Sequence, residues 1–121
     1  MKKAKLLIGI RSLKEFKKEA IAAFKRAESR LPAKEPINRL YFADSQSLFS
    51  ALSPRRMELL KFLRKEGPVS IRKAAITLKR DYKNVYDDVQ NLSRVGLVKM
   101  KKDNKFYVPW DDINIEFSLA A

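Results

Sequence analysis

The clearest pattern of apolar and polar positions lies in the middle of the chain, where three helical stripes follow one another. Residues 54–66 have an apolar side made of Met57, Leu59, Leu60, Phe62 and Leu63. Residues 70–79 place Ile71, Ala74, Ala75 and Leu78 at i, i+3, i+4 and i+7. Residues 81–95 have an inner face of Tyr82, Val85, Val89 and Leu92. The pattern predicts three consecutive amphipathic helices.

Residues that start and stop helices agree with these stripes. Ser53 and Ser70 stand where N-caps are expected, and Pro54 takes the first helical position, which proline prefers. Gly67-Pro68 ends the first helix, and Gly96 supplies the backbone freedom of a C-cap after the third. Residues 97–101 and 105–108, joined by a turn at 102–104, predict a β-hairpin.

The flanking segments predict further elements. Residues 5–10 and 37–42 are expected to form strands, and residues 113–117 a last strand. Ser12 and Glu15 form a capping box for a helix that Pro32 ends. Its apolar stripe packs against another element and consists of Leu13, Phe16, Ala20, Ala23 and Ala27. A short helix is expected from the cap Asp44 to Leu52.

Together these elements define an α+β fold that is mainly α: a winged helix-turn-helix with an N-terminal strand–helix–strand extension. Residues 1–52 form the extension, residues 53–110 the winged helix-turn-helix, and residues 111–121 a C-terminal strand. The extension either covers the core or mediates homodimerisation. We favour homodimerisation, because three helices and a hairpin usually suffice to close a winged-helix core.

The charge balance indicates a polyanionic partner. Lys and Arg number 27 against 14 Asp and Glu, which gives a net charge of +13. The basic excess is densest in residues 53–110, whereas residues 111–121 contain acidic residues and no basic ones. The protein is therefore expected to bind nucleic acid.

The residues that are missing argue against an enzyme. The chain contains no His and no Cys, so it lacks the usual general base, the thiolate nucleophile and the commonest metal ligands. The acidic doublets 87–88 and 111–112 are the only close pairs of carboxylates, and neighbouring side chains on a helix or strand point away from each other. We expect no catalytic residue, no metal site and no cofactor. No segment is long enough to cross a membrane, and residues 6–10 are too short for a signal peptide, so a cytoplasmic location is expected.

Candidate DNA contacts lie on the last two helices and the hairpin. The third helix is expected to turn Arg80, Lys83, Asn84 and Tyr86 outward, and Arg, Lys and Asn are the side chains that read base edges in a major groove. Asp87 opposes this interpretation unless Lys83 holds it. Arg72 and Lys79 of the second helix are expected to brace the DNA backbone. Lysines crowd the hairpin tip, where phosphate would offset their repulsion: Lys101, Lys102 and Lys105, with Lys99 nearby.

Structural explanations compete with each of these interpretations. The third helix could simply have a solvated basic face, and lysines also protect exposed strand edges from pairing. The aromatic residues Phe106, Tyr107 and Trp110 are more typical of hairpin packing than of a platform for stacking bases.

The sequence from Leu52 onward resembles a family of predicted transcriptional regulators of archaea and bacteria with a MarR-like winged helix. The resemblance rests on SPRRMELLKFL, RDYKNVYDDVQNL, the GLV that enters the hairpin, and VPWDDI. Upstream, IGIRSLKEF and LYFADSQSL also resemble the N-terminal part of the family, so most of the chain is covered. Several members are antitoxins, which implies a toxin protein as one further partner.

The resemblance implies DNA-binding roles for several residues before and within the third helix, and a structural role for Asp88. These DNA-binding residues are Arg80, Tyr82, Lys83, Asn84 and Tyr86. We therefore expect a homodimeric, sequence-specific regulator that binds double-stranded DNA, with an autoregulating antitoxin as one form of it. The alternatives are a basic RNA-binding or ribosome-associated protein and a winged-helix module that binds protein. A membrane-surface helix is the weakest alternative, because the first stripe is rich in alanine.

Overall fold

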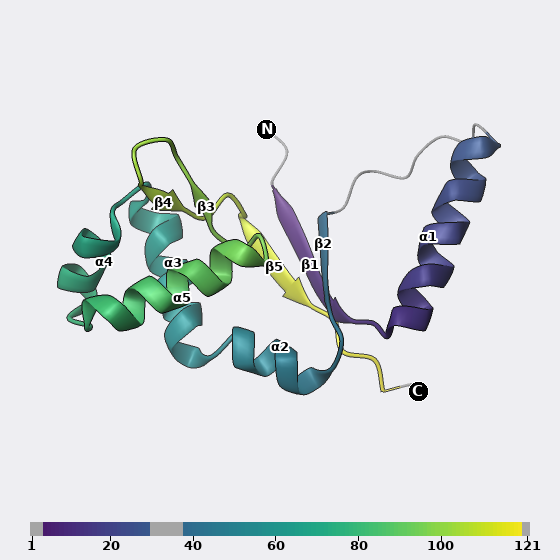
Figure 1. Cartoon of the computed structure of the whole chain (residues 1–121), viewed down its shortest axis with the longest axis horizontal. Coiled ribbons are helices and arrows are strands. Elements are labelled where there is room, and N and C mark those ends of the chain that lie inside the picture. The colour runs from purple at the N-terminus through teal and green to yellow at the C-terminus, as the bar shows by residue number, and fades with distance from the viewer. Residues whose placement is uncertain (1–3, 30–37, 120–121) are drawn as a thin grey trace. The chain divides into compact units, whose positions relative to one another are not determined.

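The computed structural model describes residues 4–29 and 38–119. This part of the chain is a mixed α/β structure, about half helical, with five helices and small sheets (Figure 1). It divides into two compact units. We call residues 5–48 and 112–121 the sheet unit, and residues 4 and 49–111 the helical unit. The expected Pro32 helix stop, and Ile37 at the start of the second expected strand, lie outside the described residues.

The sheet unit contains a three-stranded parallel sheet in the order β2-β1-β5 (Figure 1). The strands are β1 (Lys5–Ile10), β2 (Asn38–Phe42) and β5 (Asp112–Ile115). In the central strand, Ile8 lies beside Leu40 on one side and Ile115 on the other. A last strand was predicted at residues 113–117, and residues 112–115 form an edge strand of this sheet.

Helix α1 (Leu13–Glu28) begins where predicted, with the Ser12 hydroxyl accepting the Glu15 amide at 3.2 Å. The expectation that its apolar stripe packs on another element is wrong within the described residues. None of the α1 side chains is buried, and Leu13 and Phe24 are 70% and 65% exposed. Within the described residues, the stripe is an exposed apolar face of α1.

Helix α2 (Ser45–Ala51) links the two units along the chain. As predicted, Asp44 caps it: its carboxylate accepts the Ser47 amide at 2.7 Å, and this hydrogen bond lowers the pKa of Asp44. The charged form of Asp44 is thus the one that holds the first turn of α2.

The helical unit is built from α3 (Pro54–Glu66), α4 (Ile71–Leu78) and α5 (Tyr82–Arg94), followed by β3 (Lys99–Met100) and β4 (Phe106–Tyr107). The two short strands pair antiparallel, and Val69 pairs with Phe106 in an antiparallel bridge beside them. The core comes from all three helices and the start of the hairpin. Its most deeply buried side chains are Leu59, Leu63, Val85, Val89, Leu92, Leu97 and Val98.

The predicted caps of the helical unit are confirmed. Ser53 and Ser70 each accept the amide three residues ahead, at 3.3 and 3.1 Å. Gly96 has a φ of 87°, which L side chains rarely adopt, so glycine suits the end of α5. Asp81 also acts as an N-cap, for α5.

Two residues expected on inner faces are exposed instead. Met57 is 41% exposed because it stands in the first turn of α3, ahead of the buried residues Leu59, Leu60 and Leu63. Tyr82 is 53% exposed because it is the first residue of α5, where the buried face begins only at Val85. The described helices include none that is long and apolar enough to span a membrane.

Candidate nucleic-acid interface

Helices α4 and α5 are joined by a tight three-residue connection, residues 79–81. Lys79 closes α4 in the left-handed conformation, with φ 54° and ψ 46°. Its amide and that of Arg80 donate to the last carbonyls of α4, at 3.2 Å to Ile76 and 2.9 Å to Ala75. Small side chains on the buried face of α4, Ala74 and Ala75, allow α5 to approach closely. The two helices therefore form a closely packed pair.

The outward side of this pair carries most of the residues predicted to contact DNA. Arg72 and Lys79 are exposed on or next to α4. Four exposed residues come from the first turns of α5: Tyr82, Lys83, Asn84 and Tyr86. The two tyrosine rings stack with centroids 6.3 Å apart and an interplanar angle of 26°. This surface combines cations, an amide and aromatic rings at the start of one helix.

Arg80 does not face outward as predicted. Its side chain is only 16% exposed, and its Nη2 donates to Asp88 Oδ2 at 2.5 Å. Asp88 also accepts from Arg56 Nε at 3.0 Å through its other oxygen. A carboxylate between two guanidiniums strongly favours this inward position. Asp88 thus has the structural role that the resemblance implied.

Arg56 extends this cluster to the start of the unit. Its Nη1 donates to the carbonyls of Ser50 and Ala51, at 3.3 and 3.4 Å. One ion-pair cluster, Arg56–Asp88–Arg80, therefore connects the end of α2, the first turn of α3, the α4–α5 connection and the middle of α5. It fixes α5 relative to the rest of the unit.

The acidic residues near the surface behave differently from one another. Asp87 is exposed, and no ion pair joins it to Lys83 or to another basic residue in the described chain. Asp111, by contrast, is paired with Arg64. Each acidic doublet thus has one carboxylate committed to an arginine, and the described residues contain no cluster suited to a metal ion.

The hairpin tip is well ordered by backbone bonds. The Lys101 amide donates to the Lys105 carbonyl at 2.8 Å, and the Asn104 amide donates to the Lys101 carbonyl at 3.1 Å. Asn104 adopts a positive φ of 62°, as the third residue of such a turn requires. The turn predicted at residues 102–104 is confirmed, although the paired strands are shorter than expected.

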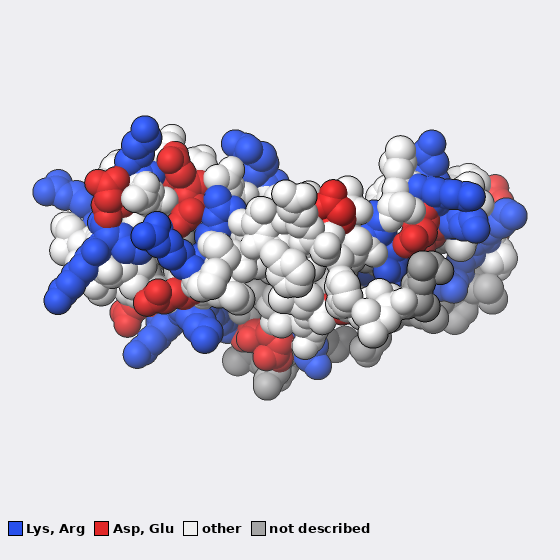
Figure 2. All heavy atoms as spheres, turned by 90° about the horizontal axis from the view of Figure 1, so that it is seen from below, with Lys and Arg blue, Asp and Glu red and all other residues white. Residues whose placement is uncertain are grey.

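Three exposed lysines lie at this tip, and they differ in the contacts that their ammonium groups make within the chain. Lys101 Nζ lies 5.7 Å from the Tyr107 ring centroid, a cation–π distance. Lys105 Nζ lies 3.7 Å from Asp103 Oδ2. Lys102 makes no such contact within the described residues, so its charge is the most available to an anion. Figure 2 shows Lys and Arg side chains, with acidic ones between them, over the end of the molecule that carries α4 and the start of α5.

Sequence reasoning missed Lys73, which is exposed beside Arg72 in the first turn of α4. The signal was present, since both residues lie outside the apolar stripe of that helix. Lys73 adds a third cation to the side of α4 on which DNA contacts were predicted.

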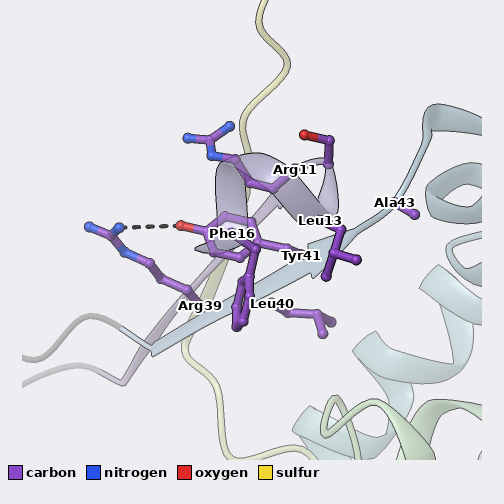
Figure 3. Close-up of a pocket in the computed structure, with 8 residues that line it drawn as sticks. Arg11, Leu13, Phe16, Arg39, Leu40, Tyr41 and Ala43 are labelled. Carbon is purple, nitrogen blue, oxygen red and sulfur yellow. Dashed lines mark hydrogen bonds between the residues drawn. The ribbon is translucent and has the colours of Figure 1, made fainter. Parts of the chain in front are cut away.

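A separate hollow of about 330 Å³ lies in the sheet unit, between the start of α1 and β2 (Figure 3). Its apolar wall includes Leu13, Phe16 and Leu40. The Arg11 guanidinium lies 5.2 Å from the Tyr41 ring centroid and donates to Glu19 at 3.1 Å, which raises the pKa of Arg11. No site was predicted here from the sequence.

This arrangement defines the class of the protein: it is a mixed α/β protein in which two helices joined by a short turn precede a hairpin with lysines at its tip. The sequence model of the HVO_A0114 family matches residues 51–115, which span α3 to β5. The chain belongs to the HVO_A0114 family. Among curated proteins and among solved structures, none matches the chain.

Proposed function

We propose that this protein is a winged helix-turn-helix regulator of transcription that binds double-stranded DNA sequence-specifically as a homodimer. The observation that carries the proposal is the closely packed α4–α5 pair with exposed Lys83, Asn84 and Tyr86, followed by a hairpin with a lysine tip. A MarR-like regulator, including one that acts as an antitoxin with a toxin partner, is one form of this proposal.

Each element has a distinct role in the proposed complex. The start of α5 enters the major groove, where Asn84 pairs with adenine and Lys83 reaches guanine or phosphate. Arg72, Lys73 and Lys79 hold the DNA backbone beside the groove, and the hairpin lysines hold phosphate further along. Arg80, paired with Asp88, positions α5 rather than donating freely to DNA.

The rival proposal is a basic RNA-binding protein, and one observation favours it. Tyr82 and Tyr86 form an exposed ring stack, and aromatic rings are used to stack unpaired bases. We favour duplex DNA because the rings lie on a helix among cations and an amide, not on an open sheet. Competition between a duplex and a structured RNA of equal length separates the two proposals.

Duplex DNA binding is expected to weaken steeply with salt. A dimer that neutralises on the order of eight phosphates gives a slope of log K against log salt of about −7. Doubling the salt concentration should then lower affinity on the order of a hundredfold. Fluorescence anisotropy on a sequence selected from a random duplex pool measures the slope. A slope near zero, an absence of binding at low salt, or preference for the structured RNA would refute the proposed function.

Substitutions in the hairpin and in α5 are expected to impair DNA binding in different ways. Replacing Lys101 and Lys102 by alanine should reduce affinity for all sequences alike and flatten the salt slope by roughly one for each phosphate that the variant no longer neutralises. Replacing Asn84 by alanine should cost about 1–3 kcal/mol on the selected site alone.

Matched controls lie in the sheet unit. Lys17→Ala with Lys18→Ala removes the same charge from exposed positions of α1, and Gln46→Ala removes an exposed amide from α2. Neither control should reproduce the corresponding pattern. If the hairpin and Asn84 variants lose specific and nonspecific affinity in parallel, the proposed division between them is wrong.

A further inference from the structure

Helix α1 has an apolar face that nothing in the described chain covers. Phe16 and Phe24 are 52% and 65% exposed, and Leu13 is 70% exposed. The alanines of the stripe are exposed as well: Ala20, Ala23 and Ala27. Exposing several large apolar side chains on one helix face is unfavourable in water, and such faces mark surfaces that associate.

The stripe has the spacing of a two-helix seam. Leu13, Phe16, Ala20, Ala23 and Ala27 follow one another at intervals of three, four, three and four residues. This is the alternation of core positions in a coiled coil, and the small residues allow two helix backbones to approach closely. The start of the seam also borders the open hollow of Figure 3, whose lining includes Leu13 and Phe16 of the start of α1 and Leu40 of β2.

We propose that α1 pairs antiparallel with α1 of a second copy of this chain, about a twofold axis near residues 21 and 22. The inference deepens the proposed function, because it rests on the homodimer proposed there and names its interface. A twofold pair covers both stripes from Phe16 to Ala27 with one self-complementary surface.

Bulk along the seam favours the antiparallel orientation. In this register Phe16 faces Ala27 of the second copy, and Ala20 faces Ala23 of the second copy. A large side chain therefore faces a small one in the two end layers, and two small side chains face each other in the central layers. A parallel pair would place Leu13 against Leu13 and Phe16 against Phe16 in the first two layers, and alanine against alanine in the three further layers, leaving the helices unevenly spaced.

Charge along the edge of the seam favours the same orientation. Glu19 and Arg26 flank the stripe on the same side of α1, seven residues apart. In the antiparallel register Glu19 lies beside Arg26 of the second copy, and symmetry repeats the pair. Glu19 uses Oε1 for Arg11 at 3.1 Å, and its Oε2 has no partner within the described residues. The carboxylate can therefore accept from both arginines.

A charge exchange tests this register. Arg26→Glu places a glutamate of one copy beside a glutamate of the other at both symmetry-related contacts. Glu19→Arg does the same with two arginines. Each variant should raise the dimer dissociation constant by roughly tenfold or more. The double variant restores opposite charges across the interface, so its dissociation constant should return close to that of the unmodified protein. Sedimentation equilibrium measures all four. The rescue cannot come from Arg11, because Glu19→Arg removes that ion pair.

Lys18→Glu is the matched control, since it reverses one charge on the face of α1 opposite the stripe; it should leave the dissociation constant unchanged. Circular dichroism verifies that each variant is folded. Failure of the double variant to recover, a monomeric unmodified protein, or binding of the apolar face to anionic lipid vesicles instead of a second copy would each overturn the proposal. Salt-dependent DNA binding by a protein that fails this test would leave the proposed function standing without this interface.

Discussion

Replacing Asp88 by alanine should lower the free energy of unfolding by about 3 kcal/mol. Asp88 is 15% exposed and holds two arginines that are 19% and 16% exposed. Without the carboxylate, two like charges remain close together with little access to water, which is the costly way to break an ion-pair cluster. Denaturant unfolding followed by circular dichroism measures the change.

The neighbouring residue provides a matched control. Asp87→Ala removes the same group one position away, from a side chain that is exposed and has no ion pair in the described chain. This change should alter stability by no more than about 0.5 kcal/mol. Equal effects of the two substitutions would show that the Arg56–Asp88–Arg80 cluster does not stabilise the fold.

A triple replacement separates net stability from the cost of unpaired charge. Arg56→Met, Asp88→Leu and Arg80→Met together remove the whole cluster and leave no unpaired charge. This variant should recover most of the stability lost in Asp88→Ala, because well-packed apolar groups often replace a buried cluster at little cost. If instead the triple variant is no more stable than the single one, shape rather than charge explains the effect.

The helices and caps were predictable because they depend on nearby residues. Ser53, Ser70 and Gly96 act within a few positions of themselves, and their predicted roles agree with the observed backbone. The buried stripe of α4 follows from 3.6-residue periodicity alone. The exact ends of the hairpin were less accurate, since pairing there is limited to two residues in each strand.

Interactions between distant residues were not predictable in the same way. The pairing of β5 with β1 joins the two ends of the chain, and no local signal in residues 111–121 specifies that partner. The inward turn of Arg80 depends on Asp88 eight residues later, and Asp88 in turn also binds Arg56, thirty-two residues before it. Arg80 was therefore predicted to face outward, as a basic residue beside a DNA-binding helix, and this prediction is wrong.

The predicted exposure of most candidate interface residues agrees with the structure, but the sequence did not show how far their charges are compensated within the chain. Lys83, Asn84, Tyr86 and Lys102 are exposed as expected. Lys105 is opposed by Asp103, and Arg80 by Asp88, so two of the expected cations are partly compensated within the chain. The remaining cations on α4, including Lys73, should carry more of the phosphate contact than the sequence alone indicated.

The double variant Phe16→Lys, Phe24→Lys should yield monomers that bind the full DNA site on the order of 10²–10⁴-fold more weakly than the unmodified protein. The factor is the advantage of linking two binding modules, which a monomer loses. Both side chains are more than half exposed in the single chain, so the substitutions should leave its fold intact. Lysines at these positions would bring like charges together across the paired α1 helices and remove their apolar contact.

The measurement combines sedimentation with binding to a near-palindromic site and to one half-site, whose centres in the full site lie on the order of 34 Å apart. The variant should bind a half-site as the unmodified monomer does, because α4, α5 and the hairpin are unchanged. A control variant with Lys14→Ala and Lys18→Ala changes two exposed α1 residues outside the stripe and should remain dimeric. If the lysine variant is monomeric and yet binds the full site with undiminished affinity, dimerisation has no part in recognition. If it remains dimeric, the α1 face is not where two copies meet, and the exposed stripe must serve another partner.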